Sequence, residues 1–106
     1  IGEVMADPDT WKVASGCGIE AYRVAKAKGV KLDITDPVRY IREFGEKIPN
    51  ARPSMLLDHL AGRMSEIDAI NGSIPRVGAQ LAIPTPVNDT VCALIRAKER
   101  RMGVRD

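Results

Sequence analysis

Apolar residues recur along most of this chain at intervals of three and four positions, the spacing that places side chains on one face of an α-helix. The clearest run stands at Ile67, Ile70, Ile74, Val77 and Leu81. No stretch alternates apolar and polar residues for long, as a half-buried strand would. The pattern predicts an all-α fold, a compact bundle of about five helices.

Three of the expected helices begin at a proline that follows a residue able to cap a helix, in the pairs Asp7-Pro8, Asp36-Pro37 and Thr85-Pro86. We expect helices over residues 8–28, 37–47 and 86–102. Gly29 ends the first, and Pro49 prevents the second from continuing. Their apolar faces are expected to comprise Val13, Cys17, Ala21 and Val24 in the first, Val38, Ile41, Phe44 and Ile48 in the second, and Val87, Val91, Leu94 and Ile95 in the third.

Two further helices are expected between these. One begins near Ser54 and ends before Gly62, and its leucines predict that it is nearly buried. The other carries the 67–81 pattern, with Ser65 and Asp68 placed much as in a capping box. Pro75 removes a backbone donor inside this pattern, so we expect a kink or break between Gly72 and Pro75.

Length and composition are those of one globular domain with an aliphatic core, since only 4% of the residues are aromatic. A net charge of +2 is too small to indicate a nucleic-acid or membrane partner. No apolar run approaches the ~20 residues that span a bilayer, and no secretory signal pattern is present, so we expect a cytoplasmic protein. Because residue 1 is Ile, we expect a piece of a longer chain.

Several kinds of site are disfavoured by the pattern. Cys17 and Cys92 lie in helical apolar patterns, which favours free thiols. No group of ligands has metal-binding spacing, and Gly16-Cys17-Gly18 lies inside a helix, so it is not a dinucleotide-binding turn. A lone histidine such as His59 is most often structural.

Three segments carry the most specific motif of the chain: Arg52-Pro53-Ser54-Met55-Leu56-Leu57-Asp58, then Gly62-Arg63-Met64-Ser65-Glu66-Ile67-Asp68-Ala69-Ile70-Asn71-Gly72, then Ile83-Pro84-Thr85-Pro86-Val87-Asn88. In order and spacing they resemble the C-terminal signature of ketopantoate reductases. The resemblance is strong over residues 52–99 and weaker over 2–32. It departs at Ile1, where many members carry Asn, and at Pro75, where an aliphatic residue is usual.

This resemblance implies a fold similar to the C-terminal domain of 6-phosphogluconate dehydrogenase. Residues 1–106 would form a single helical domain for substrate binding and dimerisation. It also implies a Rossmann-type NADPH-binding domain and a catalytic lysine, both expected upstream of Ile1, so we transfer that catalytic role to no residue of this chain.

The resemblance also assigns two site residues. Ser54 is expected to bind the substrate, and Glu66 to bind the cofactor from a position in the active site beside both cofactor and substrate. From position alone, Ser54 could equally cap a helix and Glu66 could be an acid favoured at a helix start. An intervening helix would separate them by roughly 12 Å, too far for direct contact but suited to bracketing a small keto acid. Scaffolding roles are expected for Asp68, Asn71, Thr85, Pro86 and Asn88.

Arg63 has two open interpretations, in which it either bonds carbonyls of its own turn or faces the absent domain. The sequence does not separate them.

The implied function is NADPH-dependent reduction of 2-dehydropantoate to pantoate by the complete protein, the present chain being inactive alone. The expected partners are the N-terminal domain, a small 2-keto acid and a second copy in a homodimer, without nucleic acid or membrane. One alternative is a related reductase with another keto-acid or hydroxy-acid substrate. Others are a purely structural or dimerising module, and a helix-turn-helix-like nucleic-acid-binding module, suggested by the basic run Arg96, Lys98, Arg100 and Arg101.

Overall fold

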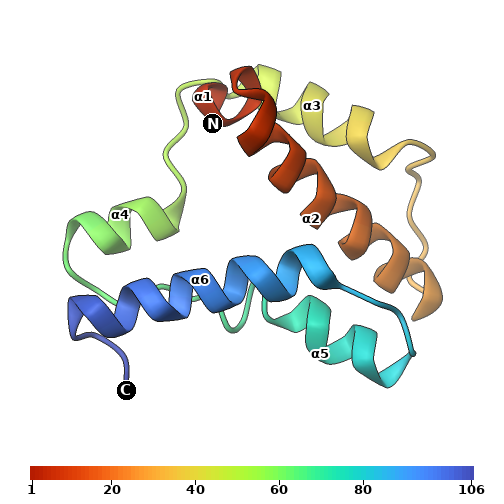
Figure 1. Ribbon diagram of the computed structural model, residues 1–106. Helices are drawn as coiled ribbons and strands as arrows, with labels where there is room; N and C mark the ends of the chain where they lie inside the picture. The colour runs from red at the N-terminus through yellow and green to blue at the C-terminus, as the bar shows by residue number, and fades with distance from the viewer.

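The computed structural model describes all residues 1–106 and consists of helices joined by turns and loops, without strands (Figure 1). The helices are α1 Gly2–Ala6, α2 Pro8–Ala27, α3 Pro37–Lys47, α4 Ser54–Leu60, α5 Ser73–Gln80 and α6 Pro86–Met102. The predicted all-α class is confirmed. The five-residue α1 was not predicted from the apolar pattern.

The helices that begin at a proline follow the predicted boundaries closely. The Asp7 carboxylate accepts hydrogen bonds from the backbone N–H groups of Asp9 and Thr10, at 2.9 and 3.0 Å. Asp36 caps α3 in the same way, accepting from a backbone N–H at 3.1 Å. Gly29 follows α2 with φ of +89°, the left-handed conformation that terminates helices at low cost in glycine.

α2 is the central helix of the domain. It contacts α1 and α3 on one side and α5 and α6 on the other, and α5 also contacts α6. α4 is different, because none of its Cα atoms lies within 8 Å of a Cα atom in another helix. In Figure 1 it lies apart from α2 and α3, toward the C-terminal end of α6.

Burial is more limited than the apolar pattern predicts. The buried apolar side chains are those of Val24, Ile67 and Cys92. Phe44 and Leu94, both expected on buried faces, are 57% and 65% exposed, and Val13 is also exposed. The prediction that α4 is nearly buried is wrong, since Leu56, Leu57 and Leu60 are all exposed. No other helix of the domain lies across the apolar face of α4.

The segment predicted as one helix over residues 65–81 is instead a series of turns followed by α5. The backbone N–H groups of Ala69 and Ile70 both bond the carbonyl of Glu66, and regular helix begins only at Ser73. Pro75 is the third residue of α5, where a missing N–H leaves no intrahelical bond unmade. The predicted break in the helix is therefore present, and the residues before it form turns instead of helix.

Two local features of this region differ from the predicted capping box. The Ser65 hydroxyl accepts a hydrogen bond from the N–H of Ile67 at 3.3 Å, whereas Asp68 takes no part in capping. Gly72 is required by close approach, because a Cβ atom there would lie 2.6 Å from the carbonyl oxygen of Asp68.

The end of α5 contains an unusual backbone conformation. Ala82 has φ of +57°, and the N–H of Ile83 bonds the carbonyl of Gly78 at 2.9 Å. The chain thus leaves α5 through a left-handed turn made by a residue other than glycine. None of the helices has the length and apolar character needed to cross a membrane.

Candidate functional site

Ser54 is the first residue of α4, and its hydroxyl makes no hydrogen bond within the chain. The N-cap position of α4 is occupied by Pro53, so Ser54 does not cap this helix. The side chain is exposed, and both its donor and its acceptor capacity remain available to a ligand.

Glu66 lies at the start of the turn that precedes α5, rather than in the first turn of a helix as predicted. Its carbonyl accepts two turn hydrogen bonds, while its exposed carboxylate has no ion pair or hydrogen bond. Ser54 and Glu66 therefore share one property: each has an exposed polar side chain without a hydrogen-bond partner in the chain.

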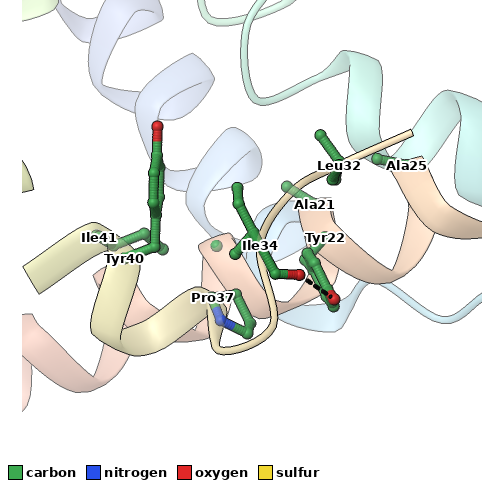
Figure 2. Close-up of a pocket in the computed structure, with 9 residues that line it drawn as sticks. Ala21, Tyr22, Ala25, Leu32, Ile34, Pro37, Tyr40 and Ile41 are labelled. Carbon is green, nitrogen blue, oxygen red and sulfur yellow. Dashed lines mark hydrogen bonds between the residues drawn. The ribbon is translucent and has the colours of Figure 1, made fainter. Parts of the chain in front are cut away.

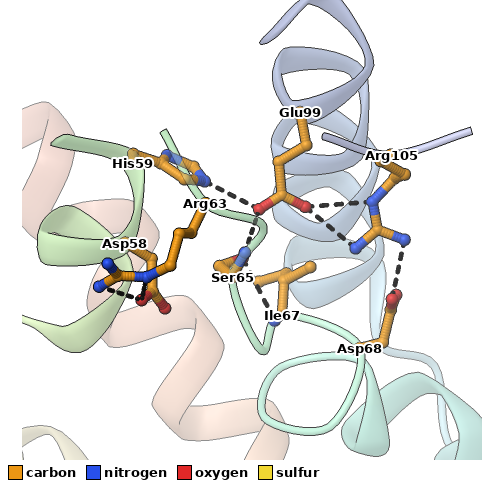
Figure 3. Close-up of polar contacts among 8 residues, drawn as sticks. All are labelled: Asp58, His59, Arg63, Ser65, Ile67, Asp68, Glu99 and Arg105. Carbon is orange, nitrogen blue, oxygen red and sulfur yellow. Dashed lines mark hydrogen bonds and ion pairs between the residues drawn. The ribbon is translucent and has the colours of Figure 1, made fainter. Parts of the chain in front are cut away.

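A buried carboxylate, that of Glu99 on α6, joins the segments that carry these two residues (Figure 3). Its Oε2 atom accepts a hydrogen bond from the Ser65 backbone N–H at 2.7 Å and lies 2.8 Å from His59 Nε2. Its Oε1 atom accepts from Arg105 Nε at 3.1 Å and forms an ion pair with Arg105 Nη2 at 3.0 Å. His59 is thus structural and buried, with a side chain 7% exposed.

The partners of Glu99 decide its ionisation. Burial alone would raise the pKa of its carboxyl group, but the hydrogen bonds from Ser65, His59 and Arg105 outweigh that effect and lower the pKa to about 2. Glu99 is therefore a carboxylate at neutral pH, as three donors around a buried acceptor require.

Asp68 and Arg63 also have specific partners in this region. Asp68 pairs with Arg96 and with Arg105, each at 2.8 Å, and hydrogen bonds from Arg96 and then Arg105 lower the pKa of its carboxyl group. Arg63 pairs with Asp58 at 3.2 Å rather than with the carbonyls of its turn. The predicted scaffolding role of Asp68 is thus visible in its contacts.

A second buried carboxylate, that of Glu20 on α2, binds the N-terminus of α6. It accepts hydrogen bonds from the backbone N–H groups of Val87 and Asn88, both at 2.8 Å. The Asn88 side-chain amide also donates to Glu20, and its carbonyl accepts from Asn71 at 3.0 Å. Asn71 and Asn88 are therefore scaffolding, as expected, whereas Thr85 makes no side-chain capping bond and Glu20 caps the helix instead.

Neither glutamate was identified from the sequence, although a signal was present. Glu20 stands three residues after Cys17 and four before Val24, on the apolar stripe of its helix, and Glu99 stands four residues after Ile95. A charged residue at an apolar position of a helical repeat indicates a buried partner.

An apolar hollow lies elsewhere, between α2, α3 and the loop that joins them (Figure 2). Its volume is about 360 Å³, and the hydroxyl of Tyr22 closes one side by donating to the carbonyl of Ile34 at 2.6 Å. Its lining includes neither Ser54 nor Glu66.

The structure contains no arrangement of side chains suited to metal binding or to catalysis by a cysteine nucleophile. No three His, Cys, Asp or Glu side chains are grouped so as to hold a metal ion. Cys17 and Cys92 are free thiols, and burial raises the pKa of both, that of Cys17 to about 11. Protonated thiols are poor nucleophiles.

Comparison with known proteins matches residues 1–99 to the family described as the C-terminal domain of ketopantoate reductase PanE/ApbA. A 2-dehydropantoate 2-reductase of Archaeoglobus fulgidus is 34% identical over 98 residues, covering 92% of this chain and 32% of the relative. The chain thus spans about a third of the length of such curated relatives.

Two solved structures share the fold. A PanE/ApbA family ketopantoate reductase from Ralstonia eutropha is 36% identical, with a TM-score of 0.84 over 96% of this chain and 34% of that one. D-mandelate dehydrogenase, solved with NADH and anilino(oxo)acetate, is 29% identical, with a TM-score of 0.84 over 98% of this chain and 58% of that one. None of these matches supports the nucleic-acid-binding alternative, and Arg96 of the basic run is already paired with Asp68.

Proposed function

The chain belongs to the family of ketopantoate reductase C-terminal domains, and we propose that it is the substrate-side domain of a reductase that converts 2-dehydropantoate to pantoate with NADPH. The observation that carries this proposal is the family match over residues 1–99. We further propose that an N-terminal nucleotide-binding domain and a catalytic lysine belong to the same protein, and that this chain alone has no activity.

We propose that Ser54 binds the keto acid. Its exposed hydroxyl can donate to a carboxylate and accept from a hydroxyl, which suits a substrate that carries both groups. Its position at the start of α4 leaves it open to a ligand lying between this domain and another.

Glu66 fits a place beside the hydrogen-bond donors of the cofactor but not beside its phosphates. An ionised carboxylate accepts hydrogen bonds and repels phosphate, so Glu66 would face hydroxyl or amide donors rather than the phosphates of NADPH. When bound, NADPH supplies the hydride that reduces the C2 carbonyl of the substrate. In this proposal Ser54 and Glu66 orient the reactants, and neither donates the proton.

The test is a measurement of NADPH oxidation by the purified full-length protein with 2-dehydropantoate. We expect Ser54→Ala to raise the KM for the keto acid about tenfold or more, the effect of losing a hydrogen bond to a charged group. Glu66→Ala should instead raise the KM for the cofactor. Ser15→Ala and Glu46→Ala are matched controls on α2 and α3 that should leave both constants unchanged. An inactive wild type, or a Glu66→Ala variant with unchanged kinetics, would refute the assignment.

A second candidate substrate class is suggested by the D-mandelate dehydrogenase neighbour. Under this alternative the protein reduces a bulkier 2-keto acid and uses NADH. Comparing 2-dehydropantoate with 2-oxo-2-phenylacetate, each with NADPH and with NADH, separates the two candidates. A kcat/KM at least tenfold higher for the phenyl substrate would favour the alternative.

The exposed leucines of α4 support one further part of the proposal, that the complete protein covers them with its N-terminal domain or with a second copy in a homodimer. A monomeric sedimentation mass of the full-length protein would exclude the homodimer and leave the N-terminal domain as the cover.

A further inference from the structure

Glu99 binds two segments that lie on either side of a short turn, and we propose that it is the positioning residue that sets the placement of Ser54 relative to Glu66. This inference rests on the proposed function, because it assigns Glu99 a task in the site formed by those two residues. Glu99 itself is buried and touches neither of them, so it acts through its hydrogen-bond partners.

The contacts of a single oxygen atom carry the argument (Figure 3). Oε2 of Glu99 lies 2.8 Å from Nε2 of His59, which is on α4 together with Ser54. The same atom accepts from the backbone N–H of Ser65 at 2.7 Å, and Ser65 directly precedes Glu66. One acceptor thus binds both segments that carry a proposed site residue.

α4 has little else to hold it. No Cα atom of another helix lies within 8 Å of a Cα atom of α4, and its leucines are exposed. Its other side-chain hydrogen bonds are the two that join Asp58 to Arg63 in the turn that follows. The His59–Glu99 contact is therefore the side-chain hydrogen bond that ties α4 to the rest of the domain.

Because Ser54 and His59 lie near opposite ends of α4, a small rotation of this helix moves Ser54 by a distance that affects the site. Ser54 lies five residues from His59, which is about 7.5 Å along the helix axis, so a rotation of about 10° around His59 moves Ser54 by about 1.3 Å. A misplacement of about 1 Å can lower a catalytic rate by two orders of magnitude. The site therefore depends on the His59–Glu99 contact, although neither of these side chains reaches the site.

Arg105 provides the contrast needed for a test, because it binds the other oxygen. Its guanidinium contacts Oε1 and also pairs with Asp68, so its removal leaves the His59 and Ser65 contacts on Oε2 in place. A role limited to general stability predicts that loss of either partner has the same consequence. The positioning role predicts that only loss of the Oε2 contacts disturbs the site.

The experiment compares His59→Ala, His59→Gln and Arg105→Ala in the full-length protein. The amide nitrogen of Gln reaches the place of Nε2, so His59→Gln keeps the hydrogen bond that His59→Ala removes. Hydrogen exchange should be about tenfold faster in residues 54–60 of His59→Ala, the effect of losing a hydrogen bond to a charged group. His59→Gln should restore the wild-type exchange rate, and α2 should exchange at the same rate in all three variants.

The kinetic arm uses the same proteins with 2-dehydropantoate and NADPH. We expect kcat/KM to fall about 10- to 100-fold in His59→Ala, to recover to within about threefold in His59→Gln, and to change less than about threefold in Arg105→Ala. Unchanged exchange of residues 54–60 in His59→Ala overturns the inference whatever the activity. Faster exchange with unaltered kinetics in an active enzyme also overturns it. If the wild type turns over neither keto acid, the proposed function fails, while the exchange result still decides whether Glu99 anchors α4.

Discussion

The two ends of α6 are held by buried glutamates that perform their task in different ways. At the N-terminal end Glu20 receives neutral donors, two backbone N–H groups and an amide, in a region where α2, α5 and α6 already pack against one another. At the C-terminal end Glu99 receives His59, a backbone N–H and an arginine, in a region where no Cα atom of another helix lies within 8 Å of a Cα atom of α4. At the N-terminal end the hydrogen bonds to Glu20 add to helix packing, whereas at the C-terminal end the hydrogen bonds and the ion pair of Glu99 take its place.

This contrast predicts which parts of the domain are stable and which are mobile. A carboxylate at a helix N-terminus is favoured by the backbone dipole and satisfies N–H groups that otherwise lack partners. Its loss affects the packed centre of the domain. A carboxylate that joins α4 and the Ser65 turn affects the placement of those segments, while the centre formed around α2 stays intact.

The largest expected effect comes from Glu20→Ala. Removing this carboxylate leaves the N–H groups of Val87 and Asn88 buried without an acceptor, at about 1–3 kcal/mol each. We expect the free energy of unfolding to fall by roughly 3–5 kcal/mol, measured by urea denaturation followed through helical circular dichroism. Hydrogen exchange should accelerate throughout α2 and α6. Acceleration confined to residues 54–72 would reverse the comparison, since that is the response expected for Glu99.

A smaller and pH-dependent effect is expected for Glu99→Gln. The pKa of Glu99 is lowered from 4.5 to about 2 in the folded state, so its contribution to stability is complete above pH 4.5 and is lost as the pH falls through 2. The variant should therefore be less stable than the wild type at pH 6, and the difference in unfolding free energy should shrink between about pH 4.5 and about pH 2. Urea denaturation at a series of pH values measures it. A difference that widens on acidification would show that the ionised form is not the stabilising one.

The smallest effect is expected for Glu43→Ala, which serves as an exposed reference for the two buried glutamates. Glu43 pairs with Arg39 across one turn of α3 at 2.9 Å, but both side chains are exposed, 57% and 76% respectively. Solvent and salt screen such a pair, so Glu43→Ala should leave the unfolding transition unchanged within error, at low salt and at high salt. A loss comparable to that of Glu99→Gln would mean that burial is not what makes the contacts of Glu99 stabilising.

The parts of the fold that could be predicted were those encoded locally. A capping aspartate followed by a proline determines where α2 and α3 begin, and Gly29 marks where α2 ends, without reference to distant residues. The 67–81 pattern failed because one apolar periodicity suits a helix and a compact turn around a buried Ile67 equally well. The exposure of α4 was unpredictable for a similar reason, since an apolar sequence does not say whether a neighbour lies within the same domain.

The candidate site divides in the same way. Ser54 and Glu66 were proposed from a resemblance to a family, and in the fold both side chains are exposed. Glu20 and Glu99 were missed because their partners lie far along the chain, 67 residues away for Val87 and 34 for Ser65. Only the folded arrangement brings those donors to the carboxylates.

Ala82 has a consequence for how this domain can change over time. Its left-handed backbone costs on the order of 1 kcal/mol for any residue with a β-carbon, and a single nucleotide change in any alanine codon yields the glycine that is free of this cost. Ala82→Gly is thus a substitution, one nucleotide change away, that would add a reserve of stability to the turn after α5. A protein with such a reserve within one mutational step can accept a destabilising change elsewhere, for example at the keto-acid site, and recover the loss here.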